Sequence, residues 1–248
     1  MLNEQTADKM MTMKLDAMEE AWRLQQKDPH ISVLSFDERM GLLVDAQWTA
    51  RENHRVKRLL HDAKLRISGA CLEDLDYSAR RELDRAVVRQ LASCKWVEER
   101  QNIIITGATG VGKSYLACAL AHQACRKGFR THYRRVPRFF EELTLAHADG
   151  TYIRLLDKLA RMDVLVLDDW AMSPLREQDR KDMLEILDDR YGARCTILTS
   201  QLPVSTWHDY VGDPTLADAI CDRIVHNSHR IALKGPTKRK QETKKEET

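Results

Sequence analysis

A glycine-rich stretch near the middle of the chain has the residue types and spacing that hold phosphate groups. GATGVGKS, at residues 107–114, matches the pattern G-x-x-x-x-G-K-[ST] in full. The glycines let backbone N–H groups turn inward around phosphates, Lys113 reaches the β- and γ-phosphates, and the Ser114 hydroxyl ligates Mg²⁺. An apolar run at 102–106 precedes the motif and a helical pattern follows it, as a phosphate loop requires. The expected nucleotide-binding residues are Gly107, Ala108, Thr109, Gly110, Val111, Gly112, Lys113, Ser114 and Tyr115.

An acidic pair ends a second apolar run, VLVLDDW, at Val164–Trp170. A buried parallel strand is expected to be continuously apolar in this way. Asp168 would emerge at the carboxyl edge of the sheet, where ligands bind in open α/β folds, and could hold Mg²⁺ mostly through water. Asp169 would orient or deprotonate the attacking water, and the alternative for it is a solvated charge at a strand end. The pair therefore favours hydrolysis of the nucleotide.

Two more polar side chains, Gln201 and Arg223, are candidates to assist hydrolysis of the nucleotide. Gln201 follows the apolar run at 196–198 and could hold the γ-phosphate or the lytic water, or simply cap the strand end. Arg223 lies in the amphipathic helical pattern DAICDRIVHNSHRI. It could pair with Asp218 or Asp222 on its own helix, or reach the γ-phosphate of a neighbouring subunit as a trans-acting finger.

The elements that must position these groups alternate between strands and helices. Short β-rich runs read NIIIT, THYRRV, DVLVLDD and CTILTS, and the helical patterns between them cover 113–126, 138–148, 152–160 and 179–190. Such alternation predicts the α/β class, with βαβ units forming a parallel sheet flanked by helices. Gly128 is expected to end the first of these helices.

The N-terminal part, from residue 2 to about 91, is expected to be helical and to form a small all-helical domain before the α/β domain. Ser35, with Glu38 three residues on, is a capping-box pattern that opens a long amphipathic helix. Basic residues dominate the second half of this helix, and both a solvated face and a phosphate-contacting stripe stay open as interpretations. The DNA-contact candidates are Arg51, Arg55, Lys57 and Arg58.

We place domain boundaries at 1–68 and 69–234, followed by a charged tail, 235–248, that is expected to be disordered.

Composition and charge exclude membrane-spanning and secreted proteins. Forty basic and 38 acidic residues give a net charge of +2, which neither predicts nor excludes nucleic-acid binding. No membrane span or signal peptide is expected, and six scattered cysteines without a C-x-x-C pair indicate reduced thiols in a cytoplasmic protein.

Taken in order, GATGVGKS, VLVLDD, ILTSQLP and DAICDRIVHNSHRI resemble the AAA+ ATPases of the DnaC/IstB group. The chain is most similar to the IstB family, the transposition helper ATPases of bacterial insertion sequences. The resemblance implies that the nucleotide is ATP, that Gln201 takes the sensor-1 position, where relatives often have Asn, and that Arg223 is an arginine finger. The sequence has no obvious arginine at the family's second sensor position, although Arg230 lies near that position. The positions that match the family's ATP site are Lys113, Ser114, Asp168 and Asp169.

The family resemblance also implies an extra helical insertion that lines a helical assembly and meets DNA. The helical patterns at 138–148 and 152–160 have room for it. YRRVPRFF, at 133–140, places Arg134, Arg135 and Arg138 beside aromatic residues. Arginines there would neutralise phosphates without reading bases, and the alternative is an ordinary strand-to-helix turn with solvated arginines.

Three functions stay open. The favoured one is an ATPase that binds duplex DNA with little sequence preference, forms a homo-oligomer with ATP at subunit interfaces, and assists a transposase in target selection. The second is a DnaC-type replicative helicase loader that binds single-stranded DNA. The third is a P-loop small-molecule kinase, which the acidic pair and the finger candidate disfavour.

Overall fold

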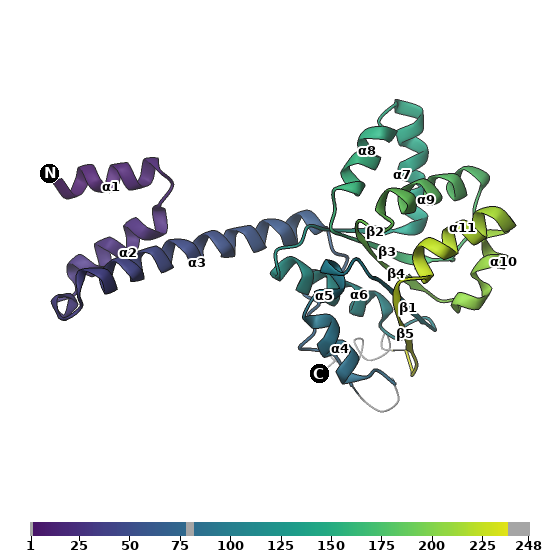
Figure 1. The fold of residues 1–248 in the computed structure, drawn as a ribbon, viewed down its shortest axis with the longest axis horizontal. Helices are drawn as coiled ribbons and strands as arrows, with labels where there is room; N and C mark the ends of the chain where they lie inside the picture. Colours follow the sequence, from purple (N-terminus) through teal and green to yellow (C-terminus); the bar gives the residue numbers. More distant parts are fainter. Residues whose placement is uncertain (1, 78–81, 238–248) are drawn as a thin grey trace, which may run out of the picture. The chain divides into compact units, whose positions relative to one another are not determined.

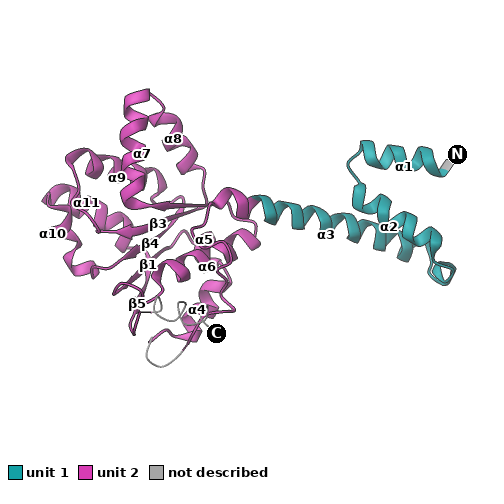
Figure 2. Cartoon of the chain, turned by 180° about the vertical axis from the view of Figure 1, so that it is seen from behind, with its two compact units in different colours: residues 1–58 teal, residues 59–248 magenta. Residues whose placement is uncertain are grey.

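The computed structural model describes residues 2–77 and 82–237, which form two compact units, 1–58 and 59–248 (Figure 2). Residues 59–68, which the sequence groups with the N-terminal helices, belong to the second unit. Most of the predicted disordered tail, 238–248, lies outside the described residues. Within the described ranges, no helix combines the length and apolarity that crossing a membrane requires.

The first unit consists of helices. They are α1 (Leu2–Thr12), α2 (Asp16–Lys27), the 3₁₀ turn η1 (Ile31–Val33) and most of α3 (Phe36–Ala63). The predicted capping box is confirmed, because Ser35 donates its N–H to Glu38 Oε2 at 2.8 Å and the Glu38 N–H donates to Ser35 Oγ at 3.3 Å. Gln47 of α3 accepts a hydrogen bond from the Met18 N–H at 3.1 Å, which ties α3 to α2.

The helical expectation is wrong between α3 and residue 85. In the described residues 64–77 and 82–84 the chain forms turns and irregular structure, and α4 (Arg85–Ala92) and α5 (Lys95–Glu98) follow. Lys64 takes a left-handed backbone conformation, φ 51°, which stops α3. Ala70, Leu72 and Leu75 are buried at spacings of two and three, so this segment packs on the core without a helical period.

The second unit contains a five-stranded parallel sheet in the order β2-β3-β4-β1-β5 (Figure 1). The strands are β1 (Asn102–Gly107), β2 (Thr131–Arg135), β3 (Val164–Trp170), β4 (Cys195–Ser200) and β5 (Ser228–Leu233). The first four match the predicted strands, whereas β5 falls in a segment expected to be helical. The helices are α6 (Lys113–Arg126), α7 (Val136–Asp149), α8 (Tyr152–Ala160), α9 (Glu177–Arg190), η3 (Val204–Thr206), α10 (Trp207–Val211) and α11 (Pro214–Val225).

Both faces of the sheet are covered, as the α/β prediction requires. Ile103 and Ile105 of β1 face a core shared with α4, α5 and α6, while Ile104 faces a core shared with α7 to α11 (Figure 1). Because β3, β4 and β1 are neighbours and all parallel, their carboxyl ends meet at one edge of the sheet. This edge receives the glycine-rich loop from β1, the acidic pair from β3 and Gln201 from the end of β4.

Candidate nucleotide site

The glycine-rich loop has the strand–loop–helix geometry that its motif predicts. Strand β1 ends at Gly107, and α6 begins at Lys113 after Gly112, whose φ is 98°. A Cβ atom on Gly107 would lie 2.3 Å from the carbonyl oxygen of Leu233 in β5, and one on Gly110 would lie 2.1 Å from Thr237 Oγ1. Only glycine fits these two positions, because both combine a positive φ with a close neighbour.

Lys113 and Gln201 both contact the loop. The Lys113 ammonium is buried and donates to the carbonyl oxygens of Gly107 at 2.8 Å and Ala108 at 2.9 Å. Gln201 Oε1 accepts a hydrogen bond from Thr109 Oγ1 at 2.8 Å. Both predicted phosphate-contacting side chains are therefore brought to the loop.

Asp168 is fully buried and accepts three side-chain hydrogen bonds. Its Oδ1 accepts from Ser114 Oγ at 3.0 Å and from the Thr199 hydroxyl, and its Oδ2 accepts from the Tyr133 hydroxyl at 2.5 Å. Burial and the negative charge of Asp168 raise the pKa of Tyr133, so the phenol stays neutral and continues to donate. The two residues expected to ligate Mg²⁺, Ser114 and Asp168, therefore lie in direct contact.

Asp169 occupies a distorted part of β3. The register between β3 and β4 shifts between Leu167 and Trp170, and Asp169 has a φ of 63°. A non-glycine residue in the left-handed region costs about 1 kcal/mol or more, and such positions cluster at functional sites. The carboxylate of Asp169 accepts a hydrogen bond from Arg135 Nε at 2.7 Å. The second acid is therefore paired with a guanidinium rather than lying free in solvent.

The residues present suit a magnesium ion shared with phosphate. Mg²⁺ commonly takes one or two protein oxygens, with water and phosphate oxygens completing an octahedron. Ser114 Oγ and Asp168 Oδ1, 3.0 Å apart, supply such a pair. Across the described ranges there is no cluster of three or more His, Cys, Asp or Glu residues, so a metal cage built by protein alone is not found there.

A cavity of about 590 Å³ adjoins the loop, and part of its wall was missed by the sequence reasoning. The irregular segment after α3 supplies Arg66, Ile67, Asp74, Leu75 and Asp76 to this wall. Tyr115 holds the segment in place, since its hydroxyl donates to the Cys71 carbonyl oxygen at 3.4 Å. The signal in the sequence was the loss of helical apolar period around Gly69, which the helical interpretation overlooked.

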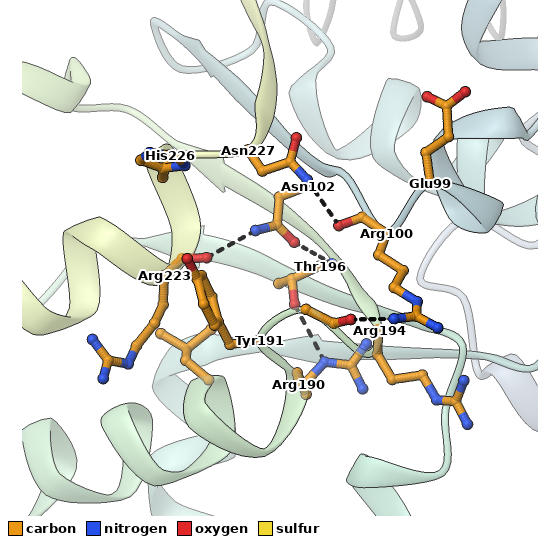
Figure 3. A pocket seen from close by; sticks show the side chains of 12 residues that line it. Glu99, Arg100, Asn102, Arg190, Tyr191, Arg194, Thr196, Arg223, His226 and Asn227 are labelled. Carbon is orange, nitrogen blue, oxygen red and sulfur yellow. Dashed lines mark hydrogen bonds between the residues drawn. The ribbon is translucent and has the colours of Figure 1, made fainter.

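Arg223 lies far from the loop of its own chain. The Arg223 carbonyl oxygen accepts a hydrogen bond at 3.0 Å from Asn102, the first residue of β1, whereas the loop follows the last residue of that strand. Its guanidinium forms an ion pair with Asp188 of α9 rather than with Asp218 or Asp222, the partners on its own helix that the sequence left open. It borders a separate cavity of about 410 Å³ together with Arg100, Arg190, Arg194 and His226 (Figure 3).

The predicted DNA-contact residues fall into two groups. Arg51, Arg55, Lys57 and Arg58 are exposed in the first unit. In the second unit, Arg134 pairs with Glu142 at 3.0 Å, Arg135 binds Asp169, and Arg138 is exposed. The second group borders a cavity of about 470 Å³, which we call the basic cavity; its walls are Lys64, Arg66, Tyr133, Arg134, Arg135, Arg138, Phe139 and Glu142.

Comparison with known proteins identifies the family. Residues 8–246 match the model of the family described as IstB-like ATP binding protein. The chain belongs to the IstB-like ATP-binding family. It is 48% identical over 245 residues, 99% of this chain and 100% of the relative, to a Sinorhizobium fredii protein named for ATP binding in an insertion sequence. A Pseudomonas fluorescens protein named in the same way is 48% identical over 206 residues, 83% of this chain and 89% of the relative.

Solved structures show the fold class of this IstB-like protein. The crystal structure of DnaI aligns with a TM-score of 0.58 at 22% identity, covering 71% of this chain and 93% of DnaI. The DnaC helicase loader aligns with a TM-score of 0.52 at 22% identity, covering 60% of this chain and 89% of DnaC. The chain therefore has the AAA+ P-loop fold, as its strand order and loop indicate.

Proposed function

We propose that this IstB-like protein is an ATPase that assembles on duplex DNA with ATP at its subunit interfaces and assists the transposase of its insertion sequence in target selection. One observation carries the proposal: the nucleotide loop and Arg223 lie at opposite ends of strand β1. A subunit built in this way has a nucleotide site at one end and a candidate finger at the other. Head-to-tail neighbours would join the two across an interface.

The loop and the acidic pair supply the chemistry of the proposed hydrolysis. The loop N–H groups and Lys113 would hold the phosphates of ATP, and Ser114 with Asp168 would hold Mg²⁺. When bound, Mg²⁺ neutralises phosphate charge and polarises the phosphoryl oxygens. Asp169 would accept a proton from the attacking water, and Gln201 would orient that water or the γ-phosphate.

Basic residues of both units would contact the DNA backbone. We propose residues 1–68 as a DNA and partner module and 69–234 as the ATPase domain, with the protein acting in the bacterial cytoplasm. Since guanidinium and ammonium groups on phosphates read no bases, binding should be steeply salt-dependent and largely nonspecific. The proposed DNA-contact residues are Arg51, Arg55, Lys57, Arg58, Arg134, Arg135 and Arg138.

The names of the full-length relatives favour the transposition helper over the alternatives. The relatives that span this chain are named for insertion sequences, whereas the likeness to DnaI and DnaC is at 22% identity and concerns the fold. A DnaC-type helicase loader, which would prefer single-stranded DNA, is the second candidate. A small-molecule kinase is the third, and it would turn over without DNA or assembly.

Sedimentation velocity on the full chain can separate these functions. A fluorescent duplex and the matching single strand are each tested with ATP, with ADP and without nucleotide, and Lys113→Ala serves as the nucleotide-blind control. The helper predicts large complexes on duplex DNA that need ATP and are lost in the variant. Preference for the single strand would support the loader, and ATP turnover without DNA-bound assembly would contradict the proposal.

A further inference from the structure

Arg66 lies where the nucleotide cavity meets the basic cavity. Among the described residues around these two cavities, it is the one that lines both. Its Nη1 is 3.6 Å from Asp168 Oδ2 and 3.7 Å from Asp169 Oδ2. A cation from the segment after α3 therefore sits beside both acids of the nucleotide site.

Charge, rather than directed hydrogen bonding, links Arg66 to the two acids. Both N–O distances are longer than a hydrogen bond. The Arg66 side chain is 43% exposed, whereas the carboxylates it faces are buried or nearly so. Arg135, in contrast, donates Nε directly to Asp169 at 2.7 Å. An exposed guanidinium in a loose ion pair exchanges partners readily, because such pairs are weak and screened by solvent.

The basic cavity offers Arg66 a second kind of anion. Its described walls hold five cationic side chains and one acid; Arg134 pairs with that acid, Glu142, and Arg135 pairs with Asp169 of the nucleotide site. The excess positive charge attracts an anion with several oxygens, and a phosphodiester of the nucleic-acid backbone is such a group. A phosphate bound there would lie next to Arg66 and compete with the carboxylates for it.

We propose that Arg66 is a positioning residue shared between the Asp168–Asp169 carboxylates and a backbone phosphate of duplex DNA in the basic cavity. The inference rests on the proposed function, since it needs DNA to be the partner. Without DNA, the Arg66 guanidinium stays within 4 Å of both acids. With DNA, the guanidinium turns to the phosphate and leaves the two carboxylates to the bound nucleotide. ATP turnover is in this way tied to bound DNA.

Competition for one guanidinium has to be reciprocal. If DNA has to break the contact between Arg66 and the acids, then removing one acid should strengthen DNA binding by up to the free energy of that contact. Asp169→Asn removes the charge and keeps the shape of the side chain. It also releases Arg135, so the share of Arg66 has to be isolated by combining Asp169→Asn with Arg66→Ala in a double-mutant cycle.

The test measures duplex affinity without nucleotide, by fluorescence anisotropy of a labelled duplex at fixed salt. The cycle contains the parent protein, Asp169→Asn, Arg66→Ala and the double variant. We expect the gain in affinity from Asp169→Asn to be about two- to fivefold larger in the parent background than in the Arg66→Ala background, the range that an exposed ion pair can supply. In the Arg66→Lys background most of that gain should remain, because lysine keeps the charge.

Two controls exclude general charge effects. Arg89→Ala removes an exposed arginine of α4, and the Asp169→Asn gain should persist in its background. Asp209→Asn removes an exposed acid of α10, and it should leave duplex affinity nearly unchanged. A second readout is ATP turnover, in which Arg66→Ala should raise the basal rate and reduce its stimulation by duplex DNA.

The outcomes separate this inference from the proposed function. Duplex binding by the parent protein with an additive cycle would overturn the role of Arg66 and leave the proposed function standing. Loss of folding in Arg66→Ala, seen by circular dichroism, shifts the cycle to Arg66→Lys against Arg66→Gln, where equal gains would overturn it. Absence of duplex binding by the parent protein would overturn both.

Discussion

Replacing Arg223 with alanine gives the sharpest test of how the nucleotide site is completed. Asn102 and Gly107 are the two ends of β1, and at about 3.3 Å per residue the strand separates them by roughly 16 Å. The Arg223 backbone is fixed at the Asn102 end by a 3.0 Å hydrogen bond. Its side chain is too short to cross that distance, so Arg223 cannot reach the loop of its own chain, and a role in ATP hydrolysis would require the site of another subunit.

The expected size of the effect follows from the charge that Arg223 would supply. A trans-acting arginine is worth about 10³–10⁵ in kcat in related phosphoryl transfers, so Arg223→Ala should reduce ATP turnover of the assembled protein at least about 100-fold. Folding should survive, because the Arg223–Asp188 pair is partly exposed and such pairs contribute about 1 kcal/mol or less. Asp188→Asn is the matched control, since it breaks the same ion pair and keeps the guanidinium.

Mixed assemblies distinguish action in trans from action in cis. Lys113→Ala removes the nucleotide site and keeps Arg223, whereas Arg223→Ala does the reverse. Mixing the two inactive variants should restore phosphate release in assemblies where an intact site meets an intact finger. Nucleotide affinity of isolated Arg223→Ala subunits, measured with a fluorescent analogue, should equal that of the parent protein. Loss of that affinity, or no recovery on mixing, would refute the reasoning.

Three further predictions concern single residues. Lys113→Ala should abolish binding of a fluorescent ATP analogue, because the phosphates lose their buried ammonium. Asp169→Asn should keep nucleotide affinity but slow phosphate release by about 10²–10⁴-fold, through loss of the base. His132 is buried, and burial lowers its pKa from 6.5 to about 4, so the unfolded chain binds this proton more readily. The contribution of neutral His132 to the free energy of unfolding should therefore be fully present above pH 6.5 and should fall by up to about 3 kcal/mol towards pH 4. Thermal melts at several pH values measure this fall, which should be smaller in His132→Phe.

The parts of the site that local sequence encodes were predictable. The loop needs glycines at fixed spacing, and the bounds of α6 match the predicted 113–126. Asp168 lies near the end of β3 and Gln201 directly follows β4, so their approach to the loop follows once β3, β4 and β1 are neighbours. The capping box at Ser35 is local as well, because both of its partners lie within four residues.

The missed parts depend on contacts between distant segments. The ion pair of Arg223 with Asp188 joins α11 to α9, and no local pattern favours Asp188 over the nearer Asp218 and Asp222. The segment around Leu75, which lines the nucleotide cavity, has no regular spacing of apolar residues, because its buried residues pack on the core at irregular intervals. Strand β5 is half-exposed and has few apolar residues, and its pairing with β1 rather than its apolar content defines it.

Strand order also changes the meaning of the arginines in YRRVPRFF. Sequence reasoning assigned Arg134, Arg135 and Arg138 to DNA and the acids to ATP, as two separate groups. Because β2 pairs with β3 in a register that sets Arg135 opposite Asp168, a predicted DNA-contact residue borders the nucleotide site. The 2.7 Å contact of Arg135 with Asp169 follows from that register. A substitution at Arg135 should therefore alter DNA affinity and ATP turnover together, whereas one at the exposed Arg138 should alter DNA affinity alone.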